Sequence, residues 1–126
     1  MHALCYIITM TAEVVADKII KAFKSGHKLL ICGNGGSAAE AQHMAGELVG
    51  KFLHQRVALP AIALTTDTSI LTSVANDISF EDVFSRQVEA LGMADDVLLS
   101  ISTSGRSKNV LKARETAKRL GLIVLD

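Results

Sequence analysis

The spacing of apolar residues changes twice in the first half of the chain. Residues 14–23 carry apolar side chains with a helical period, and Ser25-Gly26 predicts the end of that helix. Residues 28–32 (KLLIC) are a short apolar run, typical of a strand buried on both faces. The helical period returns over residues 38–52, with Ser37 in the position of an N-cap. This half therefore predicts a helix, a strand and a second helix.

The second half repeats the alternation of strand and helix. Apolar runs at 61–64 (AIAL), 97–101 (VLLSI) and 122–125 (LIVL) predict three further strands. Helical spacing at 80–91, closed by Gly92, and at 108–120, stopped by Gly121, predicts the helices between them. Buried strands that alternate with helices predict an α/β fold, in which helices cover both faces of an open parallel sheet.

Two segments of the chain resemble each other. KLLICGNGGSAAEA and VLLSISTSGRSKNV both run from an apolar strand through a small polar turn into a helix. Ligands of open parallel sheets bind at the carboxyl ends of the strands, where these two turns would lie. The turns are therefore the first candidates for a binding site.

The charge balance and the aromatic content limit the kinds of binding partner that are expected. The 13 basic and 13 acidic residues balance, and aromatic residues make up 4% of the chain. Neither value favours binding to nucleic acid or to an anionic membrane. No apolar run approaches the roughly 18 residues that a membrane span needs. The two cysteines, Cys5 and Cys32, do not form a disulfide framework, so a cytoplasmic location is expected.

The first turn, Gly33-Asn34-Gly35-Gly36-Ser37, has the composition of an anion cradle. Its glycines allow a ligand to approach the backbone, and the helix that follows offers free N–H groups and the positive end of its dipole. A merely tight turn is the alternative. The spacing Gly33-x-Gly35-x-x-Ala38 also fits the dinucleotide-binding fingerprint. That fingerprint is usually accompanied by an acidic residue at the end of the second strand, and Asp67 is the only candidate, somewhat late in the sequence.

The second turn carries four hydroxyl groups within six residues: Ser102, Thr103, Ser104 and Ser107. Hydroxyls and backbone amides together can satisfy the oxygens of a phosphate monoester. An ordinary serine-rich loop that ends in an N-cap is the alternative. Two such turns at equivalent places in the fold favour a phosphate ligand over a dinucleotide.

His43 and Glu47 lie four residues apart and share one face of the predicted helix. An imidazole and a carboxylate are half of a zinc ligand set, and the glutamate could also move a proton. The alternatives are an exposed pair with no such role or a core histidine. Lys51 is expected to form an ion pair with Glu47 or to reach an anionic ligand. Asn76-Asp77 is predicted to cap the helix that begins near Phe80, or to contact sugar hydroxyls.

Four motifs occur in order: CGNGGSAAEAQHMAGELVGKF, ALTTDTS, ANDISFEDVFSRQVEALG and DVLLSISTSGRSKNVLKA. They resemble the phosphoheptose isomerases, the sedoheptulose-7-phosphate isomerase branch of the SIS-domain family, over nearly all of residues 28–126. The resemblance implies a flavodoxin-like, three-layer α/β fold. It also implies that residues 1–126 form a single SIS domain without the C-terminal part of the family fold.

The resemblance further implies conversion of sedoheptulose 7-phosphate to D-glycero-D-manno-heptose 7-phosphate, for cell-surface polysaccharides such as lipopolysaccharide. The family forms homotetramers with sites at subunit contacts. Carried over by motif, Glu47 is the catalytic base, and His43 and Glu47 bind Zn²⁺. The phosphate ligands are Ser37, Ser102, Thr103, Ser104 and Ser107. The sugar ligands are Asn34, Gly35, Gly36, Asn76 and Asp77.

The family pattern continues past Asp126 with a helix whose glutamine and histidine complete the metal site and supply the catalytic acid. These 126 residues alone therefore provide an incomplete zinc site. Two other functions stay open. One is a non-catalytic SIS-domain protein that acts by protein contact, like the relative that binds the replication initiator. The other is a nucleotide-binding Rossmann module.

Overall fold

The fold is built on a parallel sheet at its centre. The computed structural model describes residues 2–51 and 56–126, and for residues 2–11 the course of the backbone alone. Its strands are β1 (Leu29–Gly33), β2 (Ala61–Ala63), β3 (Val97–Ile101) and β4 (Ile123–Leu125), in the order β2-β1-β3-β4. Every neighbouring pair is parallel. This is the flavodoxin-like order, in which β1 and β3 flank the topological switch point, and the predicted α/β fold is confirmed.

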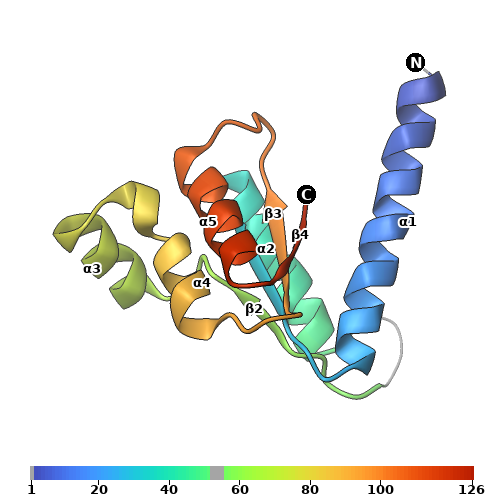
Figure 1. Cartoon of the computed structure of the whole chain (residues 1–126), viewed down its shortest axis with the longest axis horizontal. Coiled ribbons are helices and arrows are strands. Elements are labelled where there is room, and N and C mark those ends of the chain that lie inside the picture. The colour runs from blue at the N-terminus through green and yellow to red at the C-terminus, as the bar shows by residue number, and fades with distance from the viewer. Residues whose placement is uncertain (1, 52–55) are drawn as a thin grey trace.

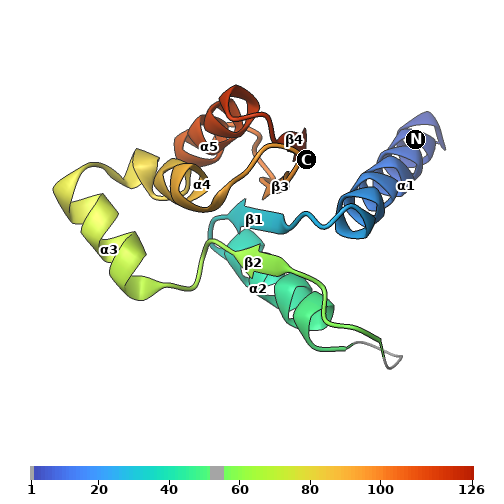
Figure 2. The same cartoon turned by 60° about the horizontal axis from the view of Figure 1, so that its bottom comes forward.

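Helices cover both faces of the sheet (Figures 1 and 2). One face packs against α4 and α5, and the other against α2 and the C-terminal end of α1. The helices are α1 (His2–Lys24), α2 (Gly36–Val49), α3 (Thr68–Asp77), the 3₁₀ turn η1 (Phe80–Asp82), α4 (Ser85–Leu91) and α5 (Lys108–Arg119).

Alternate residues of the central strands enter the two cores. Leu30 and Cys32 of β1 pack with Leu98 toward α4 and α5, while Leu29 and Ile31 pack toward α1 and α2. Because both faces of β1 are covered, all five of its residues are buried, as its continuous apolar run predicts. Cys32 is a free thiol in this core, and burial raises its pKa to about 12 despite the opposing charge of Arg114. The Cys5 side chain lies outside the described part.

Helix α1 extends well beyond the sheet (Figure 1). Its partly buried Val15, Ile19 and Phe23 pack against the core beside Ala22, whereas Val14 and Ile20 are about half exposed. Within residues 2–51 and 56–126, no helix combines the length and apolarity needed to span a bilayer.

Two of the predicted helices differ from the structure. The helix expected over residues 80–91 is divided into η1 and α4. Val83, Phe84 and Ser85 are buried in succession, which a straight helix with one inward face cannot provide. The helix expected to reach residue 52 ends at Val49, and Phe52 itself lies outside the described residues.

Helix α3 was not predicted at all. Its sequence, TSILTSVAND, contains two Thr, two Ser, one Ile and one Val, which have modest helix propensity. Asp67 caps it by accepting a hydrogen bond from the Ile70 amide at 3.0 Å. The predicted N-cap role of Asn76-Asp77 is therefore wrong, because these are the last two residues of α3 and Ser79 caps the following turn.

Candidate active site

The two polar turns begin side by side. Gly33, the last residue of β1, is the register partner of Ile101, the last residue of β3. A Cβ atom at Gly33 would lie 2.8 Å from the Ile101 carbonyl oxygen and 2.8 Å from Cβ of Ser37. Glycine at this position therefore lets the first turn of α2 pack directly against the end of β3.

We expect Gly33→Ala to destabilise the fold by about 1–3 kcal/mol, because the atoms in the way belong to backbone and to a short side chain that cannot move aside. Denaturant unfolding measures the change. Gly36→Ala is the matched control: a Cβ atom there meets open space, and alanine favours the helix. Equal stability of the two variants would show that the crowding at Gly33 has no energetic effect.

The first turn is open toward solvent. Gly35 has φ +57° and stands at the N-cap, so α2 begins at Gly36 and Ser37 is a helical residue. The predicted capping role of Ser37 is wrong for this reason, and no side-chain cap bond is present. Cβ atoms at Gly35 and Gly36 would meet nothing within 4 Å. The backbone of this turn is thus accessible to a ligand at the N-terminus of a helix.

The second turn is shaped by its own hydroxyl groups. Oγ of Ser102 accepts a hydrogen bond from the Gly105 amide at 3.0 Å, and Oγ of Ser104 accepts one from the Arg106 amide at 3.1 Å. The two Oγ atoms lie 3.5 Å apart. Ser107 precedes α5 without a side-chain cap bond, so capping does not occupy its hydroxyl group.

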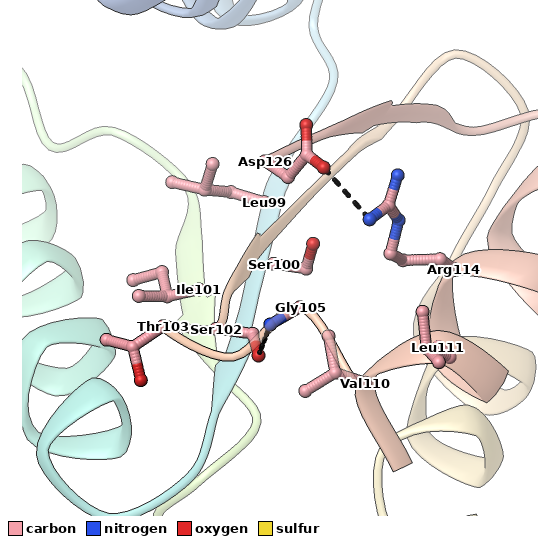
Figure 3. Close-up of a pocket in the computed structure, with 10 residues that line it drawn as sticks. All are labelled: Leu99, Ser100, Ile101, Ser102, Thr103, Gly105, Val110, Leu111, Arg114 and Asp126. Atoms are coloured by element: carbon pink, nitrogen blue, oxygen red, sulfur yellow. Dashed lines mark hydrogen bonds and ion pairs between the residues drawn. The ribbon is translucent and has the colours of Figure 1, made fainter. Parts of the chain in front are cut away.

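A cavity of about 360 Å³ lies beside the second turn (Figure 3). Ser102, Thr103 and Gly105 line it on the side of the loop, and Arg114 and Asp126, whose charged groups lie 2.9 Å apart, line the other side. The cavity joins polar loop atoms to an apolar wall, which is the usual composition of a small-molecule site. Residues of the first turn and of the His43–Glu47 pair do not line it.

A pair of amide side chains connects the two turns. Nδ2 of Asn34 donates to Oδ1 of Asn109 at 2.9 Å, and Nδ2 of Asn109 donates to Oδ1 of Asn34 at 3.0 Å. The two residues are 75 positions apart in the sequence. Sequence reasoning missed Asn109, because a lone asparagine in the first turn of a helix carries no sign of a distant partner.

His43 and Glu47 meet on the outer side of α2. Nε2 of His43 lies 2.7 Å from Oε1 of Glu47, and their side chains are 77% and 36% exposed. Glu47 therefore pairs with His43 and not with Lys51. Among the residues with described side chains, no group of three or more His, Cys, Asp or Glu could hold a metal ion. The pair fits two positions of a zinc site, which needs at least one further ligand.

Asn76 and Asp77 lie apart from the turns. They are exposed at the end of α3, where Nδ2 of Asn76 donates to Oδ1 of Asp77 at 2.9 Å. Figures 1 and 2 both place α3 at one end of the molecule. The described hydrogen bonds do not connect these two residues to either turn. The chain by itself thus sets the start of the first turn beside the end of β3 and joins Asn34 to Asn109. No described contact brings the other candidates to the hydroxyl loop.

Comparisons with known proteins show the family to which this fold belongs. The family model described as SIS domain matches residues 9–125. A phosphoheptose isomerase from Desulfovibrio desulfuricans is 59% identical over 117 residues, and one from Synechocystis is 62% identical over 110 residues. The solved phosphoheptose isomerase from Neisseria gonorrhoeae matches with a TM-score of 0.88 at 46% identity.

These matches cover most of this chain but not most of the relatives. The shares of this chain are 93%, 87% and 94%, and the shares of the three relatives are 55%, 57% and 61%. The chain thus spans somewhat more than half the length of the curated relatives it matches. On this evidence the chain belongs to the SIS-domain family, and within that family it is similar to the phosphoheptose isomerases.

Proposed function

We propose that this chain belongs to a sugar-phosphate isomerase that converts sedoheptulose 7-phosphate to D-glycero-D-manno-heptose 7-phosphate. The observation that carries the proposal is the meeting of a glycine-rich helix N-terminus and a hydroxyl-rich loop at the tips of β1 and β3. The names of the relatives supply the substrate class. The product would supply heptose for a cell-surface polysaccharide such as lipopolysaccharide, and the cytoplasmic location stays a prediction.

The phosphate group is the part of the substrate that these two turns suit. Ser37, at the start of α2, and the hydroxyl groups of Ser102, Thr103, Ser104 and Ser107 would donate to its oxygens, beside the positive end of the α2 dipole. Asn34, Gly35 and Gly36 would contact the sugar next to the phosphate. Binding energy at the phosphate would orient the distant reacting carbons.

Thr103→Val is expected to raise KM for the sugar phosphate about 10–100-fold, because a hydrogen bond to a charged oxygen contributes about 1.5–3 kcal/mol. Thr103 is exposed and lines the cavity, and no hydrogen bond of its hydroxyl group is among those described. The folded state should thus keep its unfolding temperature. Steady-state kinetics measure KM, with competition by inorganic phosphate as the control. An unchanged KM and an unchanged inhibition constant would remove Thr103 from the phosphate site.

Glu47 is the proposed catalytic base. An aldose–ketose shift removes a proton from C1 of the ketose to give an enediol and returns a proton to C2, while the O1 proton moves to O2. A carboxylate can perform the carbon steps. Nη2 of Arg56 donates a hydrogen bond to the backbone carbonyl oxygen of Glu47 at 2.6 Å. This contact leaves the Glu47 carboxylate available to His43 and to a ligand.

His43 and Glu47 are also the proposed protein ligands of Zn²⁺, and residues outside the described pair would complete the set. The ion would supply Lewis acidity to stabilise negative charge on the substrate oxygens. Nε2 of His43 contacts the Glu47 carboxylate on α2, and both side chains have solvent access.

Assembly into a homotetramer is part of the same proposal. The exposed Val14 and Ile20 on the extended α1 are apolar surface that contacts between chains would bury, and His43, Glu47, Asn76 and Asp77 are all left partly or fully exposed by the single chain. Contacts between copies could bring these residues to the two turns. Light scattering of the purified protein would decide, and the mass of a monomer would contradict the tetramer.

The direct test incubates the purified full-length protein with sedoheptulose 7-phosphate in D₂O. We expect an aldose phosphate that carries solvent deuterium at C2, since the enediol collects its proton from a base that exchanges with solvent. Product without deuterium would indicate either hydride transfer or a base that returns the same proton before it exchanges with solvent. No product, together with co-purification of a larger protein, would support the non-catalytic alternative.

A further inference from the structure

The buried amide of Asn109 faces the substrate-binding turn. Asn109 is the second residue of α5 and is 3% exposed, and its only described side-chain partner is the amide of Asn34. Asn34 is partly exposed in the first turn. The bonds at 2.9 and 3.0 Å run in opposite directions, so each amide donates once and accepts once.

We propose that Asn109 is a positioning residue that orients the Asn34 amide for the sugar and holds the two turns at a fixed separation. An amide side chain has two N–H groups and two acceptor lone pairs. The pair uses one of each on Asn34, which leaves one donor and one acceptor, with known directions, for a ligand. The inference rests on the proposed function, in which Asn34 contacts the sugar.

The position of the pair supports a role in binding rather than in stability alone. Asn34 follows β1 directly, and Asn109 lies two residues after Ser107 of the hydroxyl loop. A rotation of the Asn34 side chain would move its free donor and acceptor relative to the phosphate. Misplacement of a substrate contact by about 1 Å can lower the rate about 100-fold.

A double-mutant cycle tests the proposal in the full-length protein. We expect Asn109→Ala to lower kcat/KM by about 10–100-fold, and Asn34→Ala to lower it at least as much. The double variant should be no worse than Asn34→Ala, because Asn109 acts only through Asn34. Asn109→Asp nearly preserves the volume but, when ionised, has lost the donor. It should lower kcat/KM by about the same 10–100-fold, and it tests the proposal even if alanine unfolds the protein.

Gln87→Ala is the matched control for the loss of a buried amide. Gln87 is 5% exposed and donates to the carbonyl oxygens of Leu64 and Val83, and its described hydrogen bonds reach neither turn. The Gln87→Ala substitution should lower the unfolding temperature and leave kcat/KM unchanged. The positioning role is wrong if Asn109→Ala lowers the unfolding temperature and leaves kcat/KM unchanged. It is also wrong if the loss of kcat/KM in the double variant equals the combined losses of the two single variants.

A spectroscopic measurement separates this inference from the proposed function. In ¹⁵N-labelled protein, the side-chain amide signals of Asn34 should shift on Asn109→Asp and exchange faster with water. Unchanged signals would overturn the inference whatever the activity. Absence of turnover in the wild-type protein would overturn the proposed function, and the amide signals would still decide whether Asn109 orients Asn34.

Discussion

Glu47→Gln should lower kcat for sedoheptulose 7-phosphate by about 10²–10⁴-fold, the usual contribution of a positioned general base. The amide is nearly isosteric with the carboxylate and can still accept a hydrogen bond from Nε2 of His43, which lies 2.7 Å from Oε1 of Glu47. It cannot remove a proton from carbon. Binding of the substrate phosphate at the two turns should survive, so KM should change far less than kcat.

Glu40→Gln is the matched control for this prediction. Glu40 is an exposed carboxylate on the same helix, and no ion pair is described for it. Its amide variant should keep wild-type kcat. Full activity of Glu47→Gln, measured under the same conditions, would mean that a different group takes the proton.

Among the conservative substitutions, Asp96→Asn should have the largest effect on stability. It should lower the free energy of unfolding by about 2–4 kcal/mol. Asp96 is 2% exposed at the amino end of β3, where it accepts hydrogen bonds from the Lys28 ammonium at 2.6 Å, the Lys28 amide at 3.0 Å and the Met93 amide at 2.9 Å. Nδ1 of His27 lies 3.5 Å away. An asparagine would lose the charge and present N–H groups to donors.

The stability lost in Asp96→Asn should depend on pH. Burial alone would raise the pKa of Asp96, but the hydrogen bonds from Lys28 and Met93 outweigh burial and hold the pKa below its ordinary value. A carboxylate with a lowered pKa in the folded state stabilises the fold fully above its unfolded pKa of about 3.9. This contribution is lost as the pH falls through the lower folded pKa. The difference in unfolding free energy between wild type and Asp96→Asn should therefore be largest near neutral pH and shrink in acid.

Denaturant unfolding at a series of pH values measures this difference. Asp95→Asn is the control, because Asp95 is exposed, and its φ of 73° is tolerated by asparagine. It should change stability by less than about 0.5 kcal/mol at every pH. A constant gap between wild type and Asp96→Asn down to strong acid would show that the charge of Asp96 does not stabilise the fold.

Much of the fold follows from local patterns. The run LLIC of β1 predicts a strand covered on both faces, and the structure buries every residue of it. Gly121 has φ +86° just after α5, as its predicted role at the end of that helix requires. Local signals fail where tertiary packing or a weak propensity decides, as in the division of residues 80–91 and in α3. Asp67 offered a signal for the start of α3, but its place after a strand also suited a nucleotide ligand.

Residues close together in the chain specify the α/β alternation, the two polar turns and the groups that these turns carry, so all three can be predicted without the fold. The tertiary structure alone decided which groups meet. The strand order sets β1 beside β3, so Gly33 and Ile101 become neighbours and Asn34 reaches Asn109 across 75 residues. The Lys28–Asp96 contact spans 68 residues for the same reason. Such pairs form only when long-range packing closes the chain, and no local period or motif encodes them.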